Sequence, residues 1–174
     1  EQGQYTAVQA LLAAGYSRPL CLHLPEGHLA TTRRRQGLER ACREAGLDPD
    51  SLEHCYMALG DEHYRDIPAV LLAHMQNGIP RFDAVICGND RIAFMVYQTL
   101  LGQGLRIPDD VAVIGYDNMV GIGELFLPPL TTVQLPHYEI GRLSALHIIN
   151  GEQHLETTRV ESPYLKRDSV AHAS

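Results

Sequence analysis

The sequence predicts an α/β fold with an open, mostly parallel sheet flanked by helices. Four short apolar runs are each bounded by turn-forming residues, and segments with helical periodicity alternate with them over short connections. Strands buried on both faces of a parallel sheet read as continuous apolar runs. The run Val111–Ile114, between the turn Ile107–Asp110 and the stop Gly115–Asn118, is the clearest example.

The first elements are read from apolar spacing and from the residues that end them. In Gln4–Ala14 apolar side chains recur with helical spacing, and Gly15 is placed to end this helix. Pro19–Leu24 is a short apolar strand that a Pro-Glu-Gly turn closes. A second helix is expected over Ala30–Glu44, with Gly46 after it.

The same alternation continues through the middle of the chain. Strands are expected at Cys55–Leu59, Ala84–Cys87 and Val111–Ile114, and helices at His63–Asn77 and Asp90–Gln103. Because crossovers between parallel strands are right-handed, all four strands should end along one edge of the sheet. Ligands of open α/β sheets bind at the carboxyl ends of the strands, so this edge is the expected site.

The last third breaks this alternation. A short strand at Thr131–Gln134, a helix at Pro136–Asn150 and extended pieces at 157–162 and 164–167 follow one another. A return to strand pairing after a long helix indicates that the chain crosses between two lobes.

Composition limits the classes of partner. The formal net charge of -7 over 174 residues argues against this segment binding nucleic acid by itself, since such binding needs a basic face. No apolar run approaches the roughly 20 residues of a membrane-spanning helix, so no membrane partner is expected. The chain starts without Met inside an expected helix, so we expect a fragment.

Cysteine and histidine usage predicts neither a metal site nor a cofactor. Cys21, Cys42, Cys55 and Cys87 are widely spaced, which suits reduced, buried thiols in a cytoplasmic protein better than a disulfide framework. The nine histidines are scattered, with no His-Glu-x-x-His pattern and no Cys-x-x-Cys pair.

The order of the segments resembles the effector-binding core of LacI-type repressors, which share the type I periplasmic-binding-protein fold. The matching pieces are AVQALLAAGYSRPLCL, RRQGLERACREAGL, FDAVICGND, LRIPDDVAVIGYDN, PPLTTVQLP and SPYLKRDS. The resemblance implies that a helix-turn-helix DNA-binding domain and most of the first lobe lie outside this chain. It implies a division into a partial first lobe at 1–16, a second lobe at 17–130, a crossover at 131–150 and a return to the second lobe at 151–174. It further implies a sugar or sugar-like effector, DNA contacts through the missing domain, and a homodimer in the cytoplasm.

Asp117 and Asn89 each follow a strand end, and each allows a structural and a functional interpretation. Asp and Asn are favoured at helix N-caps and in turns, which is the structural interpretation. The functional interpretation is that a carboxylate accepts bonds from sugar hydroxyls, while an amide both donates and accepts. The resemblance implies effector binding at both positions, with Asp90 as the expected cap.

Arg34 is the most informative position on physical grounds. Three arginines lie in the first turn of a helix, where positive charge opposes the macrodipole. At 100° per residue Arg34 falls within the apolar stripe of Leu38 and Ala41, whereas Arg33 points away from it. Arg34 is therefore expected to face the open edge and to donate hydrogen bonds to a ligand oxygen. A solvated surface position is the alternative.

Other positions carry weaker expectations. Family members often present an aromatic wall near the end of the second strand, where this chain has Glu62, His63 and Tyr64. Many relatives carry a glutamine where this chain has Leu135. These four positions are possible effector contacts that depart from the family pattern.

Phe94 and Phe126 also have two readings. Ordinary core packing is one interpretation, and the resemblance implies a homodimer seam in this region.

Three functions compete at this point. The first is an effector-sensing domain of a DNA-binding regulator, and the second is a lobe of a periplasmic sugar-binding transport receptor. The third is an enzyme, which we do not expect because no G-x-S-x-G elbow, P-loop or dinucleotide-binding glycine pattern occurs.

Overall fold

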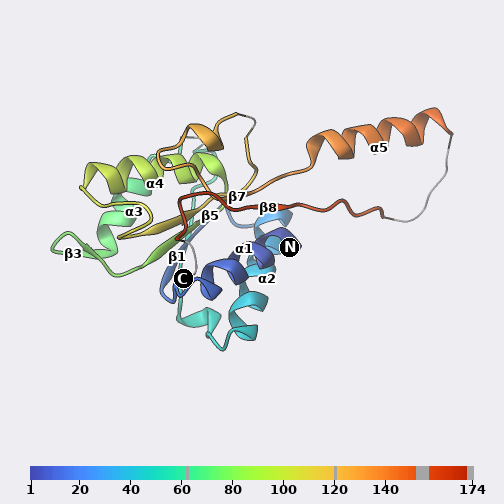
Figure 1. The fold of residues 1–174 in the computed structure, drawn as a ribbon. Coiled ribbons are helices and arrows are strands. Elements are labelled where there is room, and N and C mark those ends of the chain that lie inside the picture. The colour runs from blue at the N-terminus through green and yellow to red at the C-terminus, as the bar shows by residue number, and fades with distance from the viewer. Residues whose placement is uncertain (62, 120, 152–156, 172–174) are drawn as a thin grey trace.

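A computed structural model describes residues 1–61, 63–119, 121–151 and 157–171 (Figure 1). Its centre is a four-stranded parallel sheet in the order β2-β1-β5-β6. The strands are β1 (Pro19–His23), β2 (Glu53–Tyr56), β5 (Ala84–Cys87) and β6 (Ala112–Ile114). The predicted α/β fold with a parallel sheet is confirmed.

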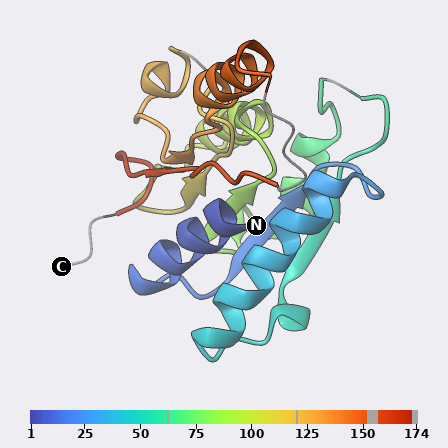
Figure 2. The same ribbon diagram turned by 90° about the vertical axis from the view of Figure 1, so that its right-hand side faces the viewer.

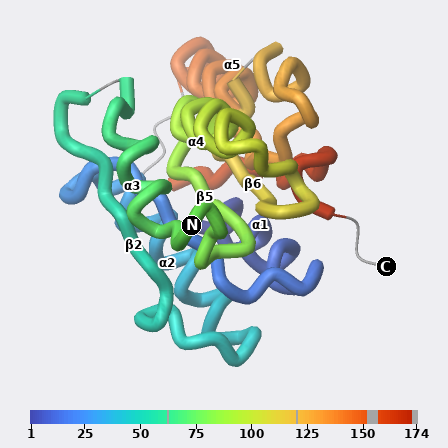
Figure 3. The backbone as a smooth tube through the Cα atoms, turned by 90° about the vertical axis from the view of Figure 1, so that its left-hand side faces the viewer, coloured from blue at the N-terminus to red at the C-terminus, as the bar shows by residue number. Residues whose placement is uncertain are grey.

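Helices cover both faces of this sheet (Figure 3). Helices α1 (Gln2–Ala13) and α2 (Leu29–Glu44) pack on one face, while α3 (Ile67–Ala73) and α4 (Asp90–Gly102) pack on the other. Successive strand residues point to opposite faces. Leu20 and Leu22 of β1 therefore join the α3–α4 core, whereas Cys21 between them joins the α1–α2 core.

The strand order places a topological switch beside β1. The chain passes from β1 through α2 to β2 on one side, and then through α3 to β5 on the other side of β1. The connections leave β1 and β5 in opposite directions, so a crevice opens at their carboxyl ends. The ends of these strands, at His23 and Cys87, therefore lie at the edge where the sequence predicts binding.

The helix expected over 63–77 is wrong at both ends. Helix α3 covers only Ile67–Ala73, and a small hairpin of β3 (Met75–Gln76) and β4 (Ile79–Pro80) follows it. Asn77 and Gly78 both have positive φ, the conformation that a two-residue hairpin turn requires. Strand β2 likewise ends at Tyr56 rather than at the expected residue 59.

Helix α1 packs closely against α2 (Figure 2). Gly37 of α2 permits this approach, because a Cβ at that position would meet the backbone of Glu1 and Tyr5. Ala7, Val8 and Leu11 are fully buried in the same cluster as α2. Within this chain α1 thus packs on the sheet, and the assignment of residues 1–16 to a partial first lobe stays a prediction.

The last elements form an arm that extends from the body (Figure 1). Strand β7 (Thr132–Val133) leads into α5 (His137–Ile149), and the chain returns to β8 (Tyr164–Leu165), which pairs antiparallel with β7. No residue of α5 is buried. Two 3-10 turns complete the described elements, at Pro49–Ser51 and Gly123–Leu125.

Within the described ranges, no helix combines the length and the hydrophobicity needed to cross a bilayer.

Candidate functional site

Arg34 joins the carboxyl ends of β5 and β6. It lies in the second turn of α2, and its Nη1 donates a hydrogen bond to the carbonyl of Gly88. Its Nη2 lies 3.1 Å from Oδ1 of Asp117, and its Cζ lies 3.7 Å from the centre of the Tyr116 ring. The Arg34 side chain is only 13% exposed. The guanidinium is thus held on three sides at the edge where the crevice opens.

Asp117 has an uncommon backbone conformation, with φ of 111°. Its N–H donates to the carbonyl of Val133 at 2.8 Å, and its own carbonyl accepts from Leu135 N–H at 3.1 Å. These two bonds hold a conformation that costs on the order of 1–3 kcal/mol, as is common at ligand-binding positions.

Burial raises the pKa of the Asp117 carboxyl, and the nearby Arg34 guanidinium opposes that shift. The Asp117 side chain caps none of the described helices.

Asn89 caps α4, so the expectation that Asp90 is the cap is wrong. The Asn89 Oδ1 accepts from Ile92 N–H at 2.8 Å, while its amide Nδ2 donates to the Tyr64 hydroxyl at 2.8 Å. Asn89 directly follows Gly88, the partner of Arg34. Arg34 and Asp117 are therefore in direct contact, and Asn89 is joined to them through the neighbouring peptide.

Asp90 is a buried residue that supports this site through hydrogen bonds. It is 1% exposed, and its two oxygens accept from the Thr132 hydroxyl at 2.7 Å and from Met119 N–H at 2.9 Å. Burial raises the pKa of Asp90. Its carboxylate ties the start of α4 to β7 and to the loop after Asp117. Sequence reasoning missed this role, because Thr132 lies 42 positions away.

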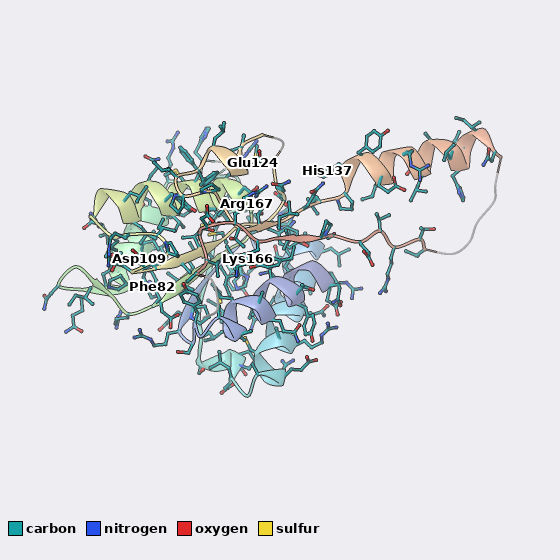
Figure 4. The ribbon with its side chains drawn as sticks, in the orientation of Figure 1. Phe82, Asp109, Glu124, His137, Lys166 and Arg167 are labelled. Atoms are coloured by element: carbon teal, nitrogen blue, oxygen red, sulfur yellow. The ribbon has the colours of Figure 1, made fainter. Side chains whose placement is uncertain are left out.

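Arg167 supports the same loop from the returning chain (Figure 4). Its Nη1 donates to the Leu130 carbonyl at 2.7 Å, and its Nη2 donates to Oδ1 of Asn118 at 3.1 Å. Glu124 lies 3.6 Å from the same guanidinium. Arg167 and Tyr116 were not predicted as site residues, because their contacts with Asn118 and with Arg34 depend on how distant segments fold together.

The possible effector contacts differ in whether they bond to Asn89 or Asp117. Tyr64 accepts the bond from Asn89, and Leu135 bonds the Asp117 carbonyl through its backbone N–H. His63 is exposed, and its N–H donates to Asp61. Glu62 lies outside the described residues.

Phe94 and Phe126 meet edge to face, with ring centres 6.0 Å apart. Phe126 also packs on Tyr97 and belongs to the α3–α4 core, whereas Phe94 is 50% exposed. The neighbouring side chains of Leu125 and Leu127 are highly exposed. Phe126 therefore has a core role, and the apolar surface around it continues outward through the other three side chains.

The site lies on an open rim rather than in a closed pocket. The cavity directly beneath Arg34, lined by Leu22, Thr31 and Gly88 among others, has a volume of only about 10 Å³. That volume is about the size of one water molecule. The described residues thus hold hydrogen-bond donors and acceptors in fixed positions on one rim of the sheet.

Comparisons with known proteins agree with this geometry. Residues 1–168 match the family described as periplasmic binding proteins and sugar binding domain of LacI family. A sucrose operon repressor from Shigella flexneri is 57% identical over 167 residues, covering 96% of this chain and 50% of that protein. The ribose operon repressor of Escherichia coli K12 is 36% identical, covering 79% of this chain and 40% of its own length.

A solved structure shows the same architecture. A LacI family transcriptional regulator from Enterococcus faecium, with bound ribose, matches with a TM-score of 0.82 and 30% identity, covering 98% of this chain and 62% of that one. This chain spans about half the length of the sucrose operon repressor it matches. The family match extends over nearly the whole chain, and so this chain belongs to the family of periplasmic binding proteins and sugar-binding domains of LacI-type regulators.

Proposed function

We propose that this chain is the effector-sensing part of a LacI-type DNA-binding transcriptional regulator, and that its effector is a carbohydrate. The observation that carries the proposal is the contact of Arg34 with both Gly88 and Asp117 at the carboxyl edge of the sheet. The sucrose and ribose operon repressors among the relatives support a sugar as the class of ligand. A cytoplasmic location follows from the proposed DNA-binding role.

The chemistry of the three side chains suits a polyhydroxylated ligand. Arg34 has five N–H donors, and the contacts with Gly88 and Asp117 use two of them. The Asp117 carboxylate has acceptor capacity beyond its bond to Arg34, and two adjacent sugar hydroxyls can donate to it. Asn89 adds an amide that both donates and accepts. A fixed guanidinium and carboxylate lose little freedom on binding, which favours affinity.

The other half of the clamp belongs to a first lobe, in this proposal. The chain crosses to that lobe through residues 131–150, and α5 packs there. An effector that touches both lobes favours one closure angle, and it shifts the populations only by its difference in affinity for the two states. Closure then alters the spacing of upstream helix-turn-helix domains, so that effector and DNA binding are linked reciprocally.

The dimer seam lies around Phe94 and Phe126 in this proposal. A self-complementary apolar patch of this kind serves both subunits of a two-fold dimer. The exposed Leu125 and Leu127 beside Phe126 supply further apolar surface for it.

Isothermal calorimetry on the full-length protein tests the proposed function. A panel of sucrose, fructose, glucose and ribose identifies the effector, and Arg34→Met then removes the fork that binds Gly88 and Asp117. We expect at least a tenfold loss of effector affinity, because removing a charged hydrogen-bond partner costs about 1.5–3 kcal/mol. Arg33→Met is the matched control, since Arg33 is exposed on the same helical turn.

Two results would refute the assignment. One is the absence of binding to any carbohydrate while the operator DNA is bound normally. The other is equal effector affinity in the Arg34 and Arg33 variants, provided that both have the circular dichroism spectrum of the parent protein.

A further inference from the structure

Three metal-ligating side chains meet on the α2-facing side of the sheet. Cys21 and His23 are two positions apart on β1, so they project from the same face. His54 lies on the neighbouring strand, directly opposite Cys21 in the parallel register. One ligand atom from each of the three lies within 4.8 Å of the others. The spacing is not visible in the sequence, because it depends on the pairing of β1 with β2.

The hydrogen bonds indicate which ring nitrogens of His54 and His23 carry a proton. One ring nitrogen of His54, Nε2, lies 3.0 Å from the carbonyl of Pro49, which can only accept. Nε2 therefore carries the proton and Nδ1 presents a lone pair. His23 Nε2 lies 2.8 Å from that lone pair and must donate to it. His54 thus has one ring nitrogen bonded to a carbonyl, as metal-binding histidines commonly do, and a metal ion would replace His23 as the partner of the other nitrogen.

We propose that Cys21, His23 and His54 bind a single zinc ion, with a water molecule as the fourth ligand. Tetrahedral zinc with bonds of about 2.0–2.3 Å places its ligand atoms roughly 3.3–3.6 Å apart. The two histidine nitrogens are 2.8 Å apart, so zinc binding requires them to separate slightly and the thiol to approach. One thiolate and two neutral imidazoles are a usual ligand set for zinc.

Proton balance is simple for this site. Zinc displaces the Cys21 thiol proton, which is released to solvent, and the His23 proton moves from Nε2 to Nδ1. The thiolate leaves the bound ion with a net charge of +1, and Arg35 and Glu39, which form an ion pair with each other, both lie nearby.

A cavity lies next to Tyr56, which is a neighbour of His23. Tyr56 stacks on His23 with ring centres 4.8 Å apart. The same tyrosine lines a cavity of about 450 Å³, together with Arg35 and Glu39. His54 is only partly buried and lies on β2, the outermost strand of the sheet. Of the three proposed ligands, His54 is thus partly exposed, whereas His23 and Cys21 are buried.

Zinc titration by calorimetry of the metal-free full-length protein tests the site. We expect one zinc ion per chain, and at least tenfold weaker binding in Cys21→Ser and in His54→Gln. The matched controls are Cys42→Ser, which alters another buried thiol of the same core, and His28→Gln, which alters an exposed histidine. Both controls should retain the affinity of the parent protein.

Cobalt spectroscopy of the unmodified protein keeps the test decisive if a variant fails to fold. Bound Co²⁺ should show a thiolate-to-cobalt charge-transfer band together with the intense visible absorption of tetrahedral coordination. A cobalt complex without the thiolate band would overturn the proposal. So would the absence of stoichiometric zinc binding, or an equal loss of affinity in the control variants.

Discussion

The body of the molecule and the α5 arm differ in how far they bury apolar side chains. In the body, every residue of β1, β5 and β6 is buried, and both faces of the sheet are covered by helices. In the arm, α5 exposes Tyr138, Ile148 and Ile149 by more than three quarters of their surface. Apolar surface of this extent is typical of an interface. The body thus has a complete core of its own, whereas the arm lacks a covering surface among the described residues.

The largest expected difference between the two regions concerns stability. Leu100 of α4 is fully buried, and Leu100→Ala should lower the free energy of unfolding of this chain by about 2–5 kcal/mol. Ile148 of α5 is 81% exposed, and Ile148→Ala should change it by less than about 0.5 kcal/mol. Urea denaturation of both variants measures the contrast. Comparable losses would show that α5 is packed in solution.

Glycine substitutions compare the stability of the same two regions, with smaller expected effects. At Gly115 an added Cβ would lie 2.8 Å from Leu130 Cδ2 and would also collide with Asp90, so Gly115→Ala should destabilise the body by about 1–3 kcal/mol. At Gly141, in the interior of α5, no atom lies within 4 Å of an added Cβ. Gly141→Ala should stabilise that helix by about 1 kcal/mol.

Denaturant midpoints measure the effect at Gly115, and amide hydrogen exchange along α5 measures the effect at Gly141. Slower exchange in the arm with an unchanged midpoint is the expected outcome for the second variant. A lower midpoint for Gly141→Ala would mean that the helix is packed more tightly than its exposure indicates.

Carboxyl groups of the two regions should respond to pH with opposite sign. Burial raises the folded-state pKa of Asp90, so its contribution to stability is present below the ordinary aspartate value of about 4 and declines as pH rises through the raised pKa. Arg142 holds the pKa of Glu139 in α5 below its usual range, so that contribution is lost as pH falls.

A series of urea denaturations between pH 4 and pH 7 separates the Asp90 contribution. Relative to Asp90→Asn, the parent protein should lose stability as pH rises over this range. A stability difference that stays constant with pH would contradict an upward shift of the Asp90 pKa.

Strand positions could be predicted from the sequence because their signals are local. The run Ala84–Cys87 was predicted without error, and Pro19–Leu24 to within one residue, since continuous apolar runs end sharply at turn formers. The prediction of a helix over 63–77 is wrong because the Asn77-Gly78 pair, which is compatible with a helix end, forms a hairpin turn instead.

In the site, too, features set by local sequence could be predicted, whereas features set by distant residues could not. Helical periodicity alone predicted the inward direction of Arg34, and its side chain is indeed largely covered. The roles of Asn89 and Asp90 could not be separated, because both residue types are good N-caps and only the distant Thr132 selects Asp90 for the buried position. The Cys21, His23 and His54 cluster likewise depends on strand pairing.

We propose that this chain carries one wall of a two-lobe carbohydrate clamp, and one comparison by calorimetry tests this proposal most directly. Titration of the effector into the full-length protein and into residues 1–174 compares the complete clamp with this wall alone. We expect at least tenfold weaker binding by residues 1–174. Equal affinities would contradict it, because the groups around Arg34 and Asp117 would then bind the ligand without a second lobe.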